Sequence, residues 1–173
     1  SELLLSKTLN KTREKILTKL DKKISKKDIS IFQKYIIRRS NSEPIAYILK
    51  EKEFWSKKFY VSKDTLIPRP ETELLVDKLT KIYKDKKVSI LDIGTGTGCI
   101  ILSLLMNLRF STGTGVDISK KAILVAKKNA IVHGLLRRVK FFNKSFQCLS
   151  DKKFDLIVSN PPYIMRKELR NLS

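Results

Sequence analysis

The chain has 173 residues, which is enough for one ordinary domain with a hydrophobic core, or for a small domain and most of a second. Its apolar fraction of 42% is typical of a globular protein. No apolar run approaches the roughly 18 residues that cross a bilayer, and no signal-peptide pattern opens the sequence. We therefore expect a cytoplasmic protein without a membrane partner, and we expect a monomer.

The cysteines and the single histidine argue against metal and disulfide chemistry. Cys99 and Cys148 lie far apart in the sequence, and neither forms a ligand-spaced cluster with His133. A zinc site or a disulfide framework needs such spacing. We expect no bound metal.

The formal net charge of +20 raises the question of nucleic acid, because a basic surface gains affinity for phosphates by releasing counterions. Lysine outnumbers arginine 28 to 9, whereas sites that read bases or clamp phosphates favour the planar fork of arginine. The charge is also spread along the whole chain. Most of it is expected to be solvated lysine on helix faces, and a weak attraction to ribosome or RNA surroundings stays open.

The first part of the chain is predicted to be helical. From Glu2 to about Arg39 apolar residues recur at spacings near three and four, which predicts two or three short helices with lysines outside. Ser25 followed by Asp28 is typical of a helix start. The polar run SNSEP, which ends at Pro44, terminates the last of these helices.

A hairpin and a helix are predicted next. Residues Glu53–Ser62 alternate aromatic and polar side chains around a Ser-Lys-Lys turn, as a short hairpin does. Pro70, with two glutamates in the first turn after it, favours a helix that runs to about Lys84. This stretch is expected to link two domains.

After Lys87 the apolar pattern changes to short runs that alternate with helical stretches. Strands are predicted at Val88–Ile93, Thr114–Ile118, Val139–Asn143 and Phe154–Ser159, and helices at Cys99–Leu108 and Lys120–His133, the second capped by Ser119. This alternation predicts βαβ units and a parallel sheet. An open doubly wound sheet usually has more than four strands, so its C-terminal edge is expected to be missing.

A glycine loop follows the first of these strands. The stretch LDIGTGTGCI places Gly94, Gly96 and Gly98 between strand and helix, where the backbone can approach a ligand and helix amides point outward. The spacing differs from the G-x-G-x-x-G of nicotinamide dehydrogenases and suits a nucleoside without phosphate. Asp117 ends the second strand, where an acid accepts hydrogen bonds from ribose hydroxyls. Separately these features are also consistent with a plain turn and a helix start, but their order favours a binding site.

S-adenosylmethionine is the ligand most consistent with this set, and the pattern resembles the class I methyltransferases. Asp92, two residues before the loop, either orients the loop backbone or meets a ligand amine. Phe146 follows the third strand, where such enzymes often place a side chain against adenine. It is equally consistent with a core residue.

The stretch VSNPPYI ends the last strand in an asparagine, two prolines and a tyrosine. Ligands bind at the carboxyl ends of strands in such a sheet, so Asn160 is expected at the mouth of the cofactor site. Each proline fixes its own φ and biases the preceding residue toward extended backbone. The side-chain carbonyl of Asn160 and the backbone carbonyl of Pro161 can then hold both N–H bonds of a planar NH2 group, while Tyr163 stacks on its flat face. No general base is required.

The N-P-P-Y pattern leaves the substrate open. It also occurs as a plain turn. As a catalytic motif it is shared by enzymes that methylate a glutamine side-chain amide and by enzymes that methylate the exocyclic amino groups of adenine or guanine in RNA or DNA.

A resemblance to a known family covers nearly the whole chain and is carried by six stretches. They are EPIAYI (Glu43–Ile48), EFWS (Glu53–Ser56), LIPRPETE (Leu66–Glu73), LDIGTGTG (Leu91–Gly98), VDIS (Val116–Ser119) and VSNPPYI (Val158–Ile164). Together they resemble the glutamine methyltransferases of peptide chain release factors, the PrmC/HemK family. The glycine loop and N-P-P-Y belong to a whole superfamily, whereas EPIAYI, EFWS and PRPETE in combination are far more specific.

The resemblance implies an α/β fold of the class I methyltransferase type, Rossmann-like with a mostly parallel sheet whose C-terminal part is missing. Residues 1–50 would form a helical substrate-docking domain without its first helix, 51–70 a β-hairpin linker, and 71–173 a C-terminally truncated S-adenosylmethionine-binding domain. The methyl acceptor would be the glutamine of the Gly-Gly-Gln loop of bacterial-type release factors.

The resemblance also implies a role for each site residue. The cofactor would be bound by Gly94, Thr95, Gly96, Thr97, Gly98, Asp117, Phe146 and Asn160, with its methionine part at the glycine loop, its ribose at Asp117 and its adenine at Phe146. The glutamine would be bound by Asn160, Pro161, Pro162 and Tyr163, of which Asn160, Pro161 and Tyr163 would be catalytic.

Some residues depart from the family pattern or stay ambiguous. Ser42 stands where the family usually has glycine, which is expected to change only a turn. The stretch Lys144–Phe146 lacks the acid that commonly precedes the aromatic residue beside adenine. Arg69 and Glu73 either support the pocket or simply begin a helix. A parallel sheet with an unpaired edge is expected to fold poorly, which puts the activity of this chain in question.

Overall fold

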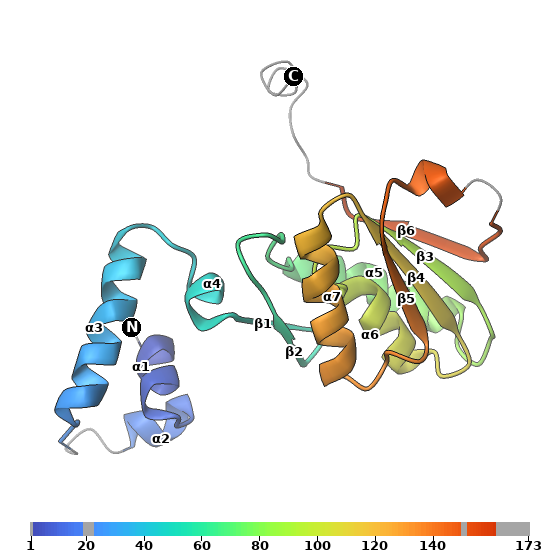
Figure 1. Ribbon diagram of the computed structural model, residues 1–173. Coiled ribbons are helices and arrows are strands. Elements are labelled where there is room, and N and C mark those ends of the chain that lie inside the picture. The colour runs from blue at the N-terminus through green and yellow to red at the C-terminus, as the bar shows by residue number, and fades with distance from the viewer. Residues whose placement is uncertain (1, 19–22, 150–151, 162–173) are drawn as a thin grey trace.

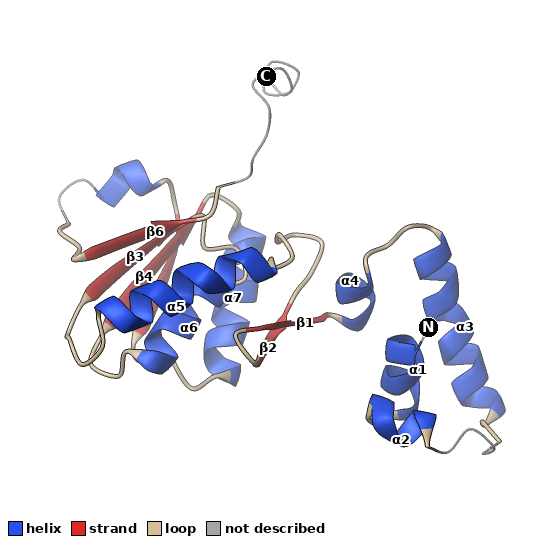
Figure 2. Ribbon diagram, turned by 180° about the vertical axis from the view of Figure 1, so that it is seen from behind, coloured by secondary structure: helices blue, strands red, loops and turns tan. Residues whose placement is uncertain are grey.

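The computed structural model describes residues 2–18, 23–149 and 152–161. Four helices open the chain, a two-stranded hairpin follows, and a four-stranded sheet with three helices packed against it comes last (Figure 1). The view from behind shows the hairpin between the N-terminal helices and the sheet (Figure 2). The predicted fold class, an α/β protein with a small helical region and a hairpin ahead of a parallel sheet, is confirmed.

The helical region consists of α1 (Glu2–Leu9), α2 (Arg13–Leu17), α3 (Lys26–Ser40) and α4 (Ile45–Leu49). Ser25 caps α3 as predicted, because its hydroxyl accepts a hydrogen bond from the Asp28 N–H at 3.1 Å. Helix α4 was not predicted from the sequence. Ser42 precedes it with φ at 62°, in the left-handed region that glycine favours, so this position is indeed part of a turn.

The hairpin consists of β1 (Glu51–Phe54) and β2 (Lys57–Tyr60), which pair antiparallel with Phe54 opposite Lys57. The predicted Ser-Lys-Lys turn was wrong. The turn is instead formed by Trp55 and Ser56, whose φ angles of 52° and 55° are those of a two-residue hairpin loop. This register points Phe54 and Phe59 to one buried face, where their rings pack edge to face with centroids 6.1 Å apart.

Apart from η2, a short 3-10 helix (Phe146–Leu149) that was not predicted, the remaining elements agree with the sequence prediction, with ends shifted by at most two residues. They are η1 (Pro70–Thr72), α5 (Glu73–Ile82), β3 (Ser89–Ile93), α6 (Cys99–Asn107), β4 (Thr112–Asp117), α7 (Lys120–Val132), β5 (Val139–Asn143) and β6 (Leu156–Ser159). Pro70 begins η1, where a proline loses no hydrogen bond. Ser119 caps α7 by accepting from the Ala122 N–H at 3.2 Å, as predicted.

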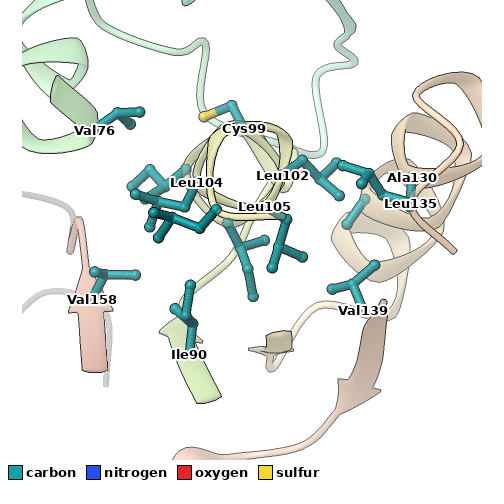
Figure 3. Packing of buried hydrophobic residues seen from close by; sticks show 14 of the residues in the cluster. Val76, Ile90, Cys99, Leu102, Leu104, Leu105, Ala130, Leu135, Val139 and Val158 are labelled. Carbon is teal, nitrogen blue, oxygen red and sulfur yellow. The ribbon is translucent and has the colours of Figure 1, made fainter. Parts of the chain in front are cut away.

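The four strands of the main sheet pair in the order β5-β4-β3-β6, and every pair is parallel. Helix α6 lies at the centre of the core, above β3. Figure 3 shows Val76 of α5 on one side of it and Ala130 of α7 on the other, with Ile90, Val139 and Val158 of the sheet beneath. On the opposite face of the sheet, the described part of the chain forms a small cluster of buried residues, namely Leu91, Val116 and Leu149.

Candidate active site

The strand order reverses beside β3, and this reversal locates the candidate site. Strand β4 pairs with one edge of β3 and β6 with the other. In open parallel sheets ligands bind at the carboxyl ends of strands at such a point. Ile93 lies opposite Ser159, whose hydroxyl donates to the Ile93 carbonyl at 3.0 Å. The next residues, Gly94 and Asn160, therefore leave neighbouring strands at the same edge of the sheet.

Three glycines allow the loop after β3 to turn sharply. Gly94, Gly96 and Gly98 have φ angles of 69°, 54° and 77°, which side chains rarely adopt. The N–H groups of Gly94 and Thr95 both donate to the Val116 carbonyl, at 2.9 and 3.0 Å, which ties the loop to β4. A Cβ atom placed on Gly94 would meet nothing within 4 Å. The loop therefore borders open space where a ligand can approach the backbone.

Asp117 ends β4 and holds the glycine loop. Its Oδ2 accepts from the Gly96 N–H at 3.0 Å, and its Oδ1 accepts from the Ser119 N–H at 2.8 Å. A carboxylate has about four acceptor positions, so lone pairs remain for ribose hydroxyls. The structure thus adds a role that the sequence did not indicate, because Asp117 holds the glycine loop as well as the Ser119 N–H just before α7.

Asp92 is buried beneath the loop, with 1% of its surface exposed. Its Oδ2 accepts from the Thr95 hydroxyl at 2.7 Å, which supports the interpretation that it orients the loop, and its Oδ1 has no partner among the described residues. Burial, together with the nearby charge of Asp117 and against the opposing hydrogen bond from Thr95, raises the pKa of Asp92 to about 7. Burial also raises the pKa of the Cys99 thiol to about 12, so Cys99 remains protonated and is no nucleophile.

Phe146 lies in η2, just after β5, and 51% of its surface is exposed. The alternative that it is a core residue is therefore wrong. An exposed aromatic ring after the third strand of the α/β region is available to a ligand. Its contact with adenine stays a prediction.

Asn160 directly follows β6 and is half-buried. Its Nδ2 donates to the Thr72 hydroxyl at 3.3 Å, which joins the end of β6 to the start of α5. Pro161 is exposed beside it. Pro162 and Tyr163, the other two predicted residues of the motif, lie outside the described residues.

Glu73 faces the hairpin. Its Oε1 accepts from the Trp55 N–H at 3.1 Å, so it anchors the hairpin turn to α5. Arg69 precedes η1 and has extended backbone, with no side-chain capping bond. Glu73 therefore does more than begin α5, and support of the pocket by Arg69 and Glu73 stays a prediction.

Two residues near the site were missed in the sequence. Thr72 lies inside the PRPETE stretch and holds the amide of Asn160. Asn129 of α7 is fully buried and bonds both the hairpin and the carbonyl of Thr97. A polar residue on an otherwise apolar helix face, between Ala126 and Ala130, was the available signal for Asn129. Nothing in the sequence indicated its partners, which are far away along the chain.

A parallel sheet with a glycine loop, an acid and an Asn-Pro turn at one edge is the arrangement of class I methyltransferases. A solved structure described as a SAM-dependent methyltransferase from Agrobacterium tumefaciens has the same fold, with a TM-score of 0.56 and 22% identity over 67% of this chain and 40% of that one. The family described as Methyltransferase small domain matches residues 67–172, and the chain belongs to this family. A second description, PrmC N-terminal domain, matches residues 1–49.

Curated relatives are similar over nearly the whole chain. A release factor glutamine methyltransferase of Buchnera aphidicola from Acyrthosiphon pisum is 43% identical over 98% of this chain and 61% of the relative. A bifunctional methyltransferase of Rickettsia typhi is 41% identical over 97% of this chain and 36% of the relative. The chain thus spans about three fifths of the first relative and about a third of the second. Within the part that the structure describes, no helix is long and apolar enough to span a membrane.

Proposed function

We propose that the chain belongs to an S-adenosylmethionine-dependent protein-glutamine N-methyltransferase of the cytoplasm. Its substrate would be the glutamine side-chain amide in the Gly-Gly-Gln loop of bacterial-type release factors. The observation that carries this proposal is the register of β3 and β6, which brings Asn160 and the glycine loop to the same edge of the sheet. The similarity to release factor glutamine methyltransferases supports the substrate class.

The residues at this edge suit S-adenosylmethionine. Open space borders Gly94, Asp117 keeps free acceptor positions, and the buried Oδ1 of Asp92 has no partner in the described part of the chain. Residues 94–98 would hold the methionine part, Asp117 the ribose and Phe146 the adenine. S-adenosylmethionine, when bound, would supply a methyl group carried on a positively charged sulfur, and this sulfur would become a neutral thioether once the amide nitrogen takes the methyl group.

Asn160 and Pro161 position the acceptor nitrogen. Because the Nδ2 of Asn160 donates to Thr72, its Oδ1 is left to accept from the substrate amide. The Pro161 carbonyl accepts the second N–H, so the two oxygens fix the plane of a weakly nucleophilic nitrogen. They hold both protons until one passes to water after the transfer. Tyr163 would cover the flat face of the amide and exclude water.

We assign residues 1–50 to docking of the protein substrate, 51–70 to the linker and 71–173 to cofactor binding and catalysis. The chain would act as a monomer without a membrane partner. Two contacts support a defined placement of the linker against the catalytic part. The Glu73 carboxylate accepts a hydrogen bond from the hairpin turn, and Nζ of Lys121 in α7 lies 3.5 Å from Oδ1 of Asp64, which follows the hairpin.

Methyl transfer is tested with radiolabelled S-adenosylmethionine and a release factor, using the protein expressed from its full reading frame. Label should enter the factor, and a Gln→Ala change in its Gly-Gly-Gln loop should abolish it. Equal labelling of the changed factor would refute the glutamine assignment.

Two variants separate the proposed roles at the site. Asn160→Ala should reduce turnover by roughly 100-fold, the order seen when a positioning group is removed, with a smaller effect on cofactor affinity. Asp117→Ala should mainly weaken cofactor binding, by about 1 to 3 kcal/mol. Calorimetry with S-adenosylhomocysteine beside the turnover assay measures both, and the reverse ranking would exchange the two roles.

Methylation of an amino group of adenine or guanine in RNA or DNA is the second candidate. It is favoured by the basic groove of about 720 Å³ between the helical region and α7, which Lys7, Arg38, Lys50 and Lys58 line. It predicts labelled nucleic acid in the same assay, with activity that falls steeply as salt rises.

A further inference from the structure

Asn129 joins two parts of the molecule that are far apart in sequence. It lies on α7 with 0% of its surface exposed. Its Oδ1 accepts from the Tyr60 N–H at 2.7 Å, and its Nδ2 donates to the Tyr60 carbonyl at 3.0 Å and to the Thr97 carbonyl at 2.8 Å. Both N–H donors and the carbonyl of one side chain are therefore used, as expected for a buried amide.

On the hairpin side, the amide takes the place of a neighbouring strand. Tyr60 ends β2, and Asn129 bonds both of its backbone polar groups, as a paired strand would. The residues on either side, Phe59 and Val61, are fully buried, and Lys128 lies over the Tyr60 ring with Nζ 3.5 Å from its centroid. The C-terminal end of the hairpin is therefore fixed to α7.

On the cofactor side, α7 contacts the second half of the glycine loop. A Cβ on Gly98 would lie 3.3 Å from the Cβ of Ala126, one helical turn before Asn129, so loop and helix are in close contact. The Thr97 carbonyl that Asn129 holds belongs to this loop, and the Thr97 hydroxyl accepts from the Cys99 N–H at 3.3 Å, at the start of α6. A shift of the hairpin along α7 would therefore pull on the loop.

We infer that Asn129 is a positioning residue that couples the hairpin, and through it the helical region, to the glycine loop. Cofactor binding at the loop and placement of the hairpin then depend on each other, because one buried side chain bonds both. This inference rests on the proposed function only in that the loop binds S-adenosylmethionine. The coupling would prepare the cofactor site when a protein substrate contacts the helical region.

The coupling can be measured without any protein substrate. Trp55, the only tryptophan of the chain, lies in the hairpin turn and reports on hairpin placement by its emission. S-adenosylhomocysteine is titrated into the protein while binding is followed by calorimetry and by Trp55 emission. The Tyr60 amide resonance gives a second signal from the hairpin. In the unchanged protein both signals should shift with the dissociation constant that calorimetry gives.

Asn129→Ala should still bind S-adenosylhomocysteine, about tenfold more weakly, as expected when a hydrogen bond that holds a site is lost. Its Trp55 response should disappear. Asn129→Asp keeps the acceptor for the Tyr60 N–H but loses the donors to the Tyr60 and Thr97 carbonyls, so it should also lose the response. Val139→Ala is the matched control, because it removes buried core contacts on β5, a strand that makes none of the hydrogen bonds of Asn129, and it should keep both binding and response.

The outcomes separate the inference from the proposed function. If the unchanged protein binds S-adenosylhomocysteine while Trp55 and the Tyr60 amide do not respond, the coupling is refuted and the function stands. A full response in Asn129→Ala refutes it equally. If the folded protein does not bind S-adenosylhomocysteine at all, the proposed function fails and the coupling fails with it. Should the Asn129 variants not fold, the Tyr60 signal of the unchanged protein decides alone.

Discussion

At the scale of single residues, the candidate site depends on polar groups that hold one another before any ligand arrives. Asp117 fixes the Gly96 amide, Asp92 fixes Thr95, and Thr72 fixes the amide of Asn160. Such pre-organisation matters because a group held in one geometry loses little freedom when it binds a ligand. The residues that hold the site are therefore as informative as those that would touch the substrate.

Asp92 should make the stability of the protein fall between about pH 4 and pH 7. Burial raises its pKa from 3.8 to about 7, with the Asp117 charge also raising it and the Thr95 hydroxyl opposing the shift. The unfolded chain therefore releases this proton at lower pH than the folded chain does. The stability that is fully present below pH 4 is lost as the pH rises toward 7.

Asp92→Asn removes this titration. The free energy of unfolding of this variant, minus that of the unchanged protein, should be greater at pH 8 than at pH 5. Urea midpoints of both proteins at the two pH values measure this difference. Cys99 lies beside Asp92, but its raised pKa keeps it neutral throughout this range. An equal difference at both pH values would show that Asp92 does not titrate there.

Thr72→Val should lower turnover by about tenfold with little change in the Michaelis constant for the release factor, because Asn160 would lose the partner that orients its amide. Thr72→Ser retains a hydroxyl and should recover most of the rate. The matched control is Thr80→Val on α5, the helix that Thr72 directly precedes, since the Thr80 hydroxyl is buried without a partner among the described residues. A loss in Thr80→Val as large as in Thr72→Val would point to a general effect of altering α5.

At the scale of elements, the sequence predicted what short-range patterns determine. The strands of the parallel sheet were found because each is a short apolar run between turn residues, and the caps Ser25 and Ser119 were found because capping is local. The hairpin turn was misplaced because Trp55 and Ser56 lack the glycine or asparagine that marks such turns. Helix α4 was missed because five residues carry too little periodicity.

The residues of the candidate site also fall into those that the sequence pattern indicated and those that it did not. Gly94, Asp117 and Asn160 were placed at one edge of the sheet because each lies at the carboxyl end of a strand, and a parallel sheet brings these ends together. Thr72 and Asn129 were not indicated, because their partners are 88 and 69 residues away and only packing unites them. Pattern therefore located the groups at the ends of the strands better than those that support them.

The hairpin turn should tolerate glycine better than serine. Ser56 has φ at 55°, where a side chain is strained and glycine is not. Ser56→Gly should raise the free energy of unfolding by about 0.5 kcal/mol, after the greater freedom of glycine in the unfolded chain is subtracted. Urea unfolding measures the change. Lys57→Gly, at the first position of β2, should instead be destabilising, and a gain there would contradict the turn assignment.

At the scale of the whole molecule, the +20 charge and the groove between the helical region and α7 raise the question of nucleic acid again. Two of the four basic residues that line this groove already have acidic partners. The Arg38 guanidinium donates two hydrogen bonds to the Glu43 carboxylate, and Nζ of Lys58 lies 2.9 Å from Oε1 of Glu51. Lys7 and Lys50 are the other two basic residues that line the groove, and neither has the planar fork of an arginine. Such a surface attracts phosphates but does not select among them.

Generic single-stranded RNA should therefore bind weakly, with a dissociation constant of roughly 10⁻⁴ to 10⁻⁶ M at physiological salt. If Lys7 and Lys50 each contact a phosphate, changing both to glutamine should reduce the slope of log K against log salt by about 1.4. A matched pair away from the groove, Lys140→Gln with Lys153→Gln, should change the slope less. Fluorescence anisotropy of a labelled oligouridine over a salt series gives these slopes. Under the proposed function the acceptor would be held by Asn160 and not by the basic surface, so competitor RNA at micromolar concentration should leave methylation of the release factor nearly unchanged. Nanomolar RNA affinity that survives high salt, or loss of methylation when RNA is added, would instead identify nucleic acid as a specific ligand.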